Sequence, residues 1–259
     1  MDIHLITLDV GNTRLGIGVF RGGELVYSRR VPHLQREDWA GMIGEAWRHF
    51  DKAQQAEAEV AGCCVDPMLL EGVEYAAKKA TGKRVQWCGQ SVDLPGNVKT
   101  AEPGKTGVDR VLVMSAAYEQ MGKACCVVDA GTAVTVDVCD DEGNFLGGAI
   151  APGIAMQLVA LEQAAAQLPD VEFKVPDGPI GTDTEEAIRH GAFHSIRGLV
   201  QQCSENYAVQ LGNWPDIIAT GGDAKMLFEG WELIHAVSPD LLHYGIAHAY
   251  AEHHIKHGT

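Results

Sequence analysis

The chain has 259 residues, a formal net charge of −15 at pH 7, 46% hydrophobic residues and 21% charged residues. This length suits two ordinary domains, and the apolar fraction is that of a folded protein. The acidic balance argues against a nucleic-acid partner, because phosphate binding needs clustered Lys and Arg. No stretch approaches the roughly 18 apolar residues of a membrane span, and the N-terminus lacks the basic start of a signal peptide. We therefore expect a cytoplasmic protein without a membrane partner.

The cysteines and the C-terminal histidines are interpreted as structural residues. The seven cysteines include two adjacent pairs and no Cys-x-x-Cys motif, which is typical of small buried apolar side chains. His253, His254 and His257 lie close together without an accompanying Cys or carboxylate pattern. They favour the polar end of a C-terminal helix over a metal site.

Hydrophobic periodicity in the first half of the chain predicts three strands followed by helix, strand, helix and strand. The strands are expected at 3–9, 14–20, 24–31, 59–65 and 84–88, and the helices at 39–50 and 69–80, with Gly82 as a C-cap.

The second half starts with the same pattern. Strands are expected at 124–129, 133–139, 145–150 and 216–220. Helices are expected from Ile154 and from about Thr184, the latter with Thr182 and Glu185 as a capping box, and two shorter helices near the end. A helix over 111–121 connects the halves. The repetition predicts an α/β protein made by duplication of one unit, with domains at 1–115 and 116–259.

Each predicted half carries an apolar strand that ends in Asp and turns through Gly and Thr. The first copy is Asp9-Val10-Gly11-Asn12-Thr13 and the second is Asp129-Ala130-Gly131-Thr132. Glycine lets the backbone approach a ligand, exposed N–H groups in a turn bind anions, and the hydroxyls add donors. A carboxylate beside a phosphate makes sense when a hard cation lies between them. Two such turns facing across a cleft would hold a polyphosphate from both sides.

One copy alone would be an ordinary hairpin turn, but two copies at equivalent places argue against that interpretation. Neither a Walker-type Gly-x-x-x-x-Gly-Lys motif nor a Gly-x-Gly-x-x-Gly motif follows a strand, so those nucleotide sites do not compete.

Six short motifs in order make the chain similar to type III pantothenate kinases, within the superfamily of acetate and sugar kinases, heat-shock ATPases and actin. The motifs are Asp9–Thr13, Gly107–Arg110, Asp129–Asp137, Gly147–Ile154, Asp183–Thr184 with Ala187, Ile188 and Gly191, and Gly221–Ala224. The resemblance implies two ribonuclease H-like (actin-like ATPase) domains with a nucleotide cleft between them, and a homodimer. The implied reaction is ATP-dependent phosphorylation of pantothenate to 4′-phosphopantothenate, the first step of coenzyme A biosynthesis.

The resemblance also implies roles for individual residues. Asp109 would be the catalytic base, Asp129 a ligand of a monovalent cation (K⁺ or NH₄⁺), and Asp9 a residue on the side of the Mg²⁺ that accompanies ATP. The implied ATP-binding residues are Asp9, Val10, Gly11, Asn12, Thr13, Arg14, Leu15, Gly16 and Thr132. The implied pantothenate-binding residues are Gly107, Val108, Asp109, Arg110 and Thr184.

The chain departs from the family pattern at three places. No Tyr stands near Thr100, where many members use one to line the pantothenate pocket, and Asp183 replaces a usual Asn. After the first turn the chain reads Arg14-Leu15-Gly16, where members often have a bulkier or basic third residue. Two other functions stay open: a nucleotide-binding accessory protein of the same fold without turnover, and a kinase or phosphatase of the superfamily acting on another small substrate such as a sugar. The presence of Asp9, Asp109 and Asp129 together favours an enzyme.

Overall fold

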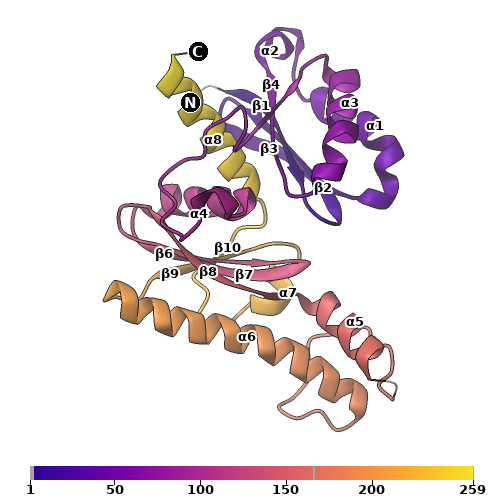
Figure 1. The fold of residues 1–259 in the computed structure, drawn as a ribbon. Helices are drawn as coiled ribbons and strands as arrows, with labels where there is room; N and C mark the ends of the chain where they lie inside the picture. The colour runs from indigo at the N-terminus through magenta and orange to yellow at the C-terminus, as the bar shows by residue number, and fades with distance from the viewer. Residues whose placement is uncertain (1–2, 166, 259) are drawn as a thin grey trace. The chain divides into compact units, whose positions relative to one another are not determined.

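The computed structural model describes residues 3–165 and 167–258. The chain divides into two compact units. Unit 1 comprises Met1–Gly96, Glu102–Ala116 and Asp240–Thr259, and unit 2 comprises Asn97–Ala101 and Ala117–Pro239. Each unit is built on its own five-stranded sheet (Figure 1).

The sheet of unit 1 has the order β3-β2-β1-β4-β5. Strand β1 pairs antiparallel with β2 and parallel with β4. The strands are β1 (His4–Val10), β2 (Arg14–Arg21), β3 (Glu24–Pro32), β4 (Glu59–Cys64) and β5 (Val85–Trp87).

The sheet of unit 2 has the order β10-β9-β6-β7-β8. Written from the other edge it is β8-β7-β6-β9-β10, which matches β3-β2-β1-β4-β5 strand for strand. Strand β6 pairs antiparallel with β7 and parallel with β9, as β1 does with β2 and β4. The strands are β6 (Cys125–Ala130), β7 (Ala133–Cys139), β8 (Phe145–Pro152), β9 (Asp216–Thr220) and β10 (Ala236–Val237). The shared topology confirms the duplicated α/β fold.

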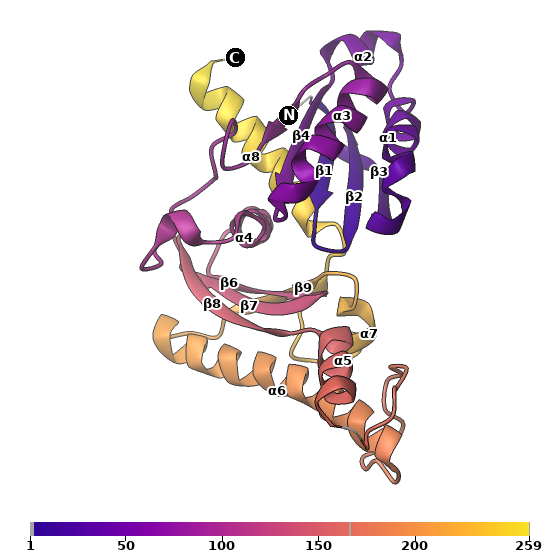
Figure 2. The same ribbon diagram turned by 45° about the vertical axis from the view of Figure 1, so that its right-hand side comes forward.

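Helices cover both faces of the unit 1 sheet. Alternate residues of a strand point to opposite faces, and β1 carries apolar side chains on both, so each face is buried by helices. Ile6, Leu8 and Val10 pack with α1 (Trp39–Trp47) and α3 (Leu70–Thr81). Leu5, Ala61 and Cys63 pack on the other face with α8 (Leu241–His257) and the start of α4 (Val108–Met121). Figures 1 and 2 both show α1 and α3 on the side of this sheet away from α8. The short α2 (Lys52–Glu57) precedes β4.

In unit 2 the long helix α6 (Thr184–Leu211) runs along one face of the sheet (Figure 2). Its Ala192, Ile196 and Val200 share a core with β6, β7 and β9, with α5 (Ile154–Ala164) and with α7 (Ala224–Phe228). Among the described residues, no helix is both long and apolar enough to cross a bilayer.

The observed elements follow most of the predicted ones, with some differences. Helix α4 begins three residues before the predicted 111, and the last helix, α8, has 17 residues and is not short. The predicted capping box is wrong. Asp183 is the N-cap of α6 and accepts from the N–H of Glu186, whereas Thr182 donates to the Glu186 carboxylate. Gly82 is the left-handed C-cap of α3, as predicted.

The two compact units do not follow the predicted division at 115/116. Residues after Asp240 belong to unit 1, and Asn97–Ala101 belongs to unit 2. The physical reason for the first difference is burial, because Ile246, Ala247 and Ala249 of α8 fill the core on the β1–β4 face.

Candidate active site

The first Asp-Gly-Thr turn connects β1 to β2 in unit 1. The N–H of Gly11 donates to the carbonyl of Arg14 at 3.1 Å, which closes the turn. The side chains of Asn12, Thr13 and Arg14 are exposed there. The His33 ring donates from Nε2 to the Gly11 carbonyl at 2.8 Å and so fixes the turn from outside it. The turn therefore presents polar groups on a constrained backbone.

Asp9 lies one residue before the end of β1, opposite Gly16 of β2 and Cys63 of β4. It shares a strand face with Leu5 and Thr7, and this is the face covered by α8. A Cβ on Gly16 would lie 3.1 Å from the Asp9 Cβ and 3.1 Å from His243 Nε2. Glycine at this position thus leaves the space in which the Asp9 side chain lies.

Asp109 lies in the first turn of α4, where Gly107 precedes the helix. A Cβ on Gly107 would lie only 2.6 Å from Asp109 Oδ1, so glycine permits this close approach. Burial raises the pKa of Asp109, while backbone hydrogen bonding at Arg110 and the Arg110 charge oppose that rise. A carboxylate with a raised pKa in a partly buried place is a better proton acceptor than an exposed one.

Asp9 and Asp109 both lie near Cys63 in unit 1, because Asp9 is its neighbour in the sheet and Val108, which precedes Asp109, packs against the cluster that contains Cys63. Burial is the main cause that raises the pKa of the Cys63 thiol well above its usual value, followed by the charge of Asp109 and then that of Asp9. Cys63 is 1% exposed and lies beside Asp9 in the sheet. Two carboxylates separated by 100 positions thus act on the same buried thiol at the carboxyl end of β1 and β4.

Unit 2 assembles the second turn in the same way. The N–H of Gly131 donates to the Ala133 carbonyl at 3.0 Å, and the N–H of Gly153 donates to the Thr132 carbonyl at 3.0 Å. Gly221 has a φ of +94°, and a Cβ there would collide with the Ala130 carbonyl and with Asp129 Oδ1. Asp129, the Gly131–Thr132 turn, the start of α5 and the Gly221 turn therefore lie together.

The surroundings of Asp129 fit a cation bound through oxygen ligands. Asp129 is opposite Thr135 of the neighbouring strand β7 and Thr220 of the neighbouring strand β9, so residues with hydroxyl groups flank it on both sides. Thr135 Oγ1 is buried and has no hydrogen-bond partner. Buried polar atoms are normally satisfied, so this orphaned oxygen beside a carboxylate favours an ion in that position.

The remaining predicted residues are placed as follows. Val10 and Leu15 are fully buried in the core of unit 1, so they could contact a ligand only through the backbone. Thr132 is exposed on the turn of unit 2. Thr184 is exposed at the first position of α6 in unit 2, whereas Gly107, Val108 and Arg110 lie in unit 1. The predicted pantothenate residues are therefore divided between the two units.

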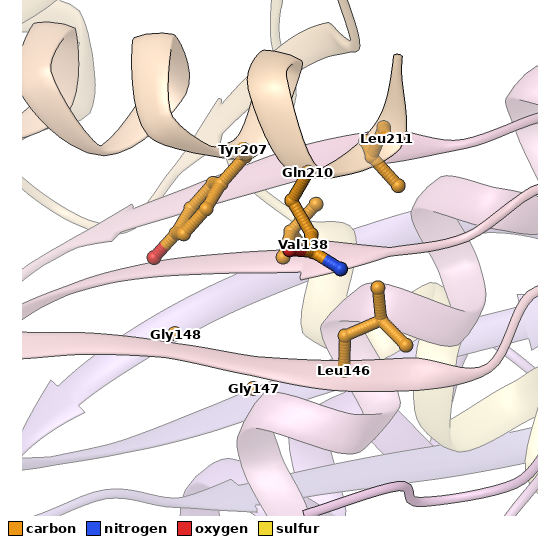
Figure 3. A pocket seen from close by; sticks show the side chains of 7 residues that line it. All are labelled: Val138, Leu146, Gly147, Gly148, Tyr207, Gln210 and Leu211. Carbon is orange, nitrogen blue, oxygen red and sulfur yellow. The ribbon is translucent and has the colours of Figure 1, made fainter. Parts of the chain in front are cut away.

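A cavity of about 210 Å³ lies elsewhere in unit 2, between β7, β8 and the end of α6 (Figure 3). It is lined by Val138, Leu146, Gly147, Gly148, Tyr207, Gln210 and Leu211. Tyr207 lies at one side of it and donates its hydroxyl proton to the Val136 carbonyl at 2.9 Å. None of the three candidate aspartates lines this cavity. Gly148 has a packing role, because a Cβ there would collide with Asp137 and the Val136 carbonyl.

Sequence reasoning missed three residues of unit 1 that support the site. Cys63 was interpreted only as a small apolar residue, and neither His33 nor His243 was considered. The sequence around His33 gives no sign that its ring contacts the Gly11 carbonyl. The partner of His33, Gly11, lies 22 positions away in the sequence, and the partner of His243, Thr7, lies 236 positions away.

The two duplicated units place the protein in the actin-like ATPase fold class. The structure superposes on a Campylobacter jejuni protein described as a conserved Baf family transcriptional activator, with a TM-score of 0.62, 19% identity, and coverage of 95% of this chain and 98% of that one. It also superposes on MreB5 of Spiroplasma citri bound to AMPPNP, with a TM-score of 0.54, 13% identity and full coverage of both chains. At these identities the similarity shows the fold alone.

Sequence comparison identifies the family. Residues 5–206 match the family model described as type III pantothenate kinase. A type III pantothenate kinase of Dehalococcoides mccartyi is 31% identical over 252 residues, which cover 95% of each chain. The chain belongs to the type III pantothenate kinase family.

Proposed function

We propose that this protein transfers the γ-phosphoryl group of ATP to the primary hydroxyl of pantothenate, giving ADP and 4′-phosphopantothenate, the first step of coenzyme A biosynthesis. The observation that carries the proposal is the placement of Asp9 beside Cys63 in the sheet, with Val108, the neighbour of Asp109, packed against the cluster that contains Cys63, next to a closed Gly–Thr turn. In this proposal Asp9 would be the phosphate-side acid and Asp109 the proton acceptor, both in unit 1.

Asp109 serves as the general base in this proposal. Phosphoryl transfer depends mainly on positioning and charge stabilisation, and the acceptor hydroxyl loses its proton late in the transfer. Burial raises the pKa of Asp109 and so increases its affinity for that proton. Gly107, Val108 and Arg110 would form the pantothenate side, where the Arg110 guanidinium matches the substrate carboxylate by a bidentate contact. Thr184 would add a hydroxyl to the same substrate.

The proposed ATP contacts come from both turns. Gly11, Asn12, Thr13 and Thr132 would offer backbone N–H and side-chain donors to the phosphates, and Arg14 and Gly16 would complete the first hairpin. Gly131 favours this role, because a Cβ there would meet nothing within 4 Å. The open space at this turn is where a phosphate can approach the backbone.

Two kinds of cation belong to the proposal. Mg²⁺ with ATP and a monovalent cation, K⁺ or NH₄⁺, would neutralise charge on the transferring phosphates. Asp9 would hold the Mg²⁺ side. Asp129 would hold the monovalent cation, together with the buried Thr135 hydroxyl that has no hydrogen-bond partner.

We also propose that the protein works as a cytoplasmic homodimer. Ile150 of β8 and Met156 and Val159 of α5 are apolar side chains that a second copy would cover, and they are 64%, 45% and 47% exposed. Exposed apolar groups gathered on one face are typical of association surfaces.

The decisive test is ADP release by the purified protein with Mg·ATP and K⁺, with and without pantothenate. Release that depends on pantothenate is expected, and Asp109→Asn should slow it by roughly 10²–10⁴-fold while ATP binding persists. Near-full activity of Asp109→Asn would remove the base assignment. ATP binding without pantothenate-dependent release would instead indicate an accessory protein of this fold.

A further inference from the structure

Within residues 3–165 and 167–258, one group of three His, Cys, Asp or Glu residues has its ligand atoms gathered closely enough to hold a metal ion. It consists of Asp93, His253 and His257, whose ligand atoms all lie within 4.8 Å of one another. Asp93 lies in the segment after β5, and the two histidines lie one turn apart on α8. All three belong to unit 1.

The spacing of these atoms is that of ligands around a small ion. His257 Nε2 lies 2.9 Å from Asp93 Oδ2, and His253 Nδ1 lies 3.3 Å from the same oxygen. In a tetrahedral zinc site with bonds of about 2.0–2.2 Å, neighbouring ligand atoms are about 3.3–3.5 Å apart. The two distances to Asp93 Oδ2 are close to this spacing, and the exposure of the His257 and Asp93 side chains, 47% and 52%, leaves room for water as a fourth ligand.

The local charges favour a cation at this position and also show what competes with it. A hydrogen bond from His257 lowers the pKa of Asp93, and its carboxylate is ionised at neutral pH as that of any exposed aspartate is. The Lys256 ammonium lies 3.6 Å from Asp93 Oδ2, but its side chain is 68% exposed and can move into water. The N–H of Asp93 donates to His253 Nδ1 at 3.2 Å, and an ion would replace this long bond.

We propose that Asp93, His253 and His257 form a surface site for a borderline transition-metal ion of the Zn²⁺ type, which fastens the segment after β5 to the C-terminal end of α8. Imidazole nitrogen with carboxylate oxygen is a ligand set that suits zinc, whereas Mg²⁺ prefers oxygen ligands alone. The site lies outside the proposed phosphoryl-transfer machinery. Its occupancy therefore changes the stability of unit 1 and does not supply the chemistry of the reaction.

Zinc binding to the full chain, without a histidine purification tag, tests the proposal by isothermal titration at pH 7.5. We expect one ion per chain, with affinity reduced at least roughly tenfold in Asp93→Asn, His253→Ala and His257→Ala, because altering even outer-shell partners costs that much. Lys256→Met should bind zinc more tightly, because it removes a competing charge. Bound Co²⁺ should give the intense visible absorption of a four-coordinate ion.

The chain provides a matched control in His190 and His194, which also lie four residues apart on a helix, with stacked rings 5.5 Å apart. Replacing both by Ala should leave zinc binding unchanged. Binding that survives loss of His253 and His257 would overturn the proposal, as would the absence of binding at 100-fold excess of zinc over protein. Circular dichroism of each variant checks that α8 is still folded.

Discussion

His243 Nδ1 lies 2.8 Å from Thr7 Oγ1, which connects the first turn of α8 to the middle of β1 in unit 1. Both residues are buried, His243 at 2% and Thr7 at 0% exposure. The imidazole occupies the space over Gly16 and Gly18, where a Cβ would lie within 3.1 Å of its ring atoms. Because Thr7 and Asp9 share a strand face, this contact fixes the strand two residues before the candidate phosphate-side acid.

Replacing His243 should destabilise unit 1. His243→Ala leaves a cavity and removes the partner of a buried hydroxyl, so we expect a loss of about 2–4 kcal/mol in the free energy of unfolding. Urea denaturation measures it. Thr7→Val is the matched variant, since it removes the hydroxyl and keeps the side-chain volume, and its cost should be smaller. Equal stability of His243→Ala and the parent would contradict this role.

His243 should also make stability depend on pH. Burial lowers its pKa to about 4 in the folded protein, whereas the unfolded chain has a His pKa of about 6.5. Between those values the unfolded state binds the extra proton, so stability is fully present above about pH 6.5 and falls as the pH decreases towards 4. The total loss is about 3 kcal/mol.

The measurement for this pH dependence is the difference in unfolding free energy between pH 7 and pH 5. His243→Gln cannot titrate, so its difference should be smaller than that of the parent protein. Because the other titrating groups are common to both proteins, a parallel pH dependence in the two would assign the effect to groups other than His243.

Gly131→Ala should impair ATP binding without affecting folding. A Cβ at Gly131 meets no atom within 4 Å, so the fold tolerates it, but it would occupy the space where a phosphate approaches the turn. We expect ATP affinity to fall by roughly tenfold or more, since loss of one good hydrogen bond to a charged group costs about 1.5–3 kcal/mol. Calorimetric titration with ATP gives the affinity, and thermal unfolding confirms the unchanged fold.

Two other glycines serve as controls for Gly131. A Cβ on Gly104 also meets nothing within 4 Å, so Gly104→Ala should leave both folding and ATP binding unchanged. A Cβ on Gly153 would collide with the Gly131 carbonyl, so Gly153→Ala should lose stability as well as affinity. Normal ATP affinity in Gly131→Ala would argue against this turn as a phosphate site.

Asp129 should determine the response to monovalent cations. If Asp129 and Thr135 hold the ion, activity should rise steeply with K⁺ and not with Na⁺, and Asp129→Asn should abolish that dependence. Thr135→Val removes the orphaned hydroxyl and should raise the K⁺ concentration needed for half-maximal activity. Activity assays across a K⁺ series measure both, and a flat response of the parent protein would remove the assigned role.

Local patterns predicted most of the elements, because strand alternation and the helical period of apolar residues are short-range signals. The duplication was also predictable, since both copies of the Asp-Gly-Thr turn follow an apolar strand. The observed Asp9 and Asp129 occupy equivalent positions, each paired with a residue on the antiparallel neighbour and one on the parallel neighbour.

What local patterns could not predict were contacts between distant segments. The sequence gives no sign that His243 reaches Thr7, or that a carboxylate from Asp93 joins His253 and His257, since 160 positions or more separate the partners. The sequence shows that no Tyr stands near Thr100, but it does not show which residues surround Thr100. Thr100 lies beside Gly147 in unit 2, 3.8 Å from where a Cβ of that glycine would be.

The return of α8 to unit 1 has a consequence for the order in which the protein matures. Unit 2 ends at Pro239, so all of its residues are synthesised before those of α8. Unit 1 begins first, yet Ile246, Ala247 and Ala249 must arrive before the β1–β4 face is covered. During synthesis, the half that carries Asp9 and Asp109 therefore remains open until α8 has left the ribosome, and a chain stopped at Pro239 would expose that apolar face to chaperones and proteases.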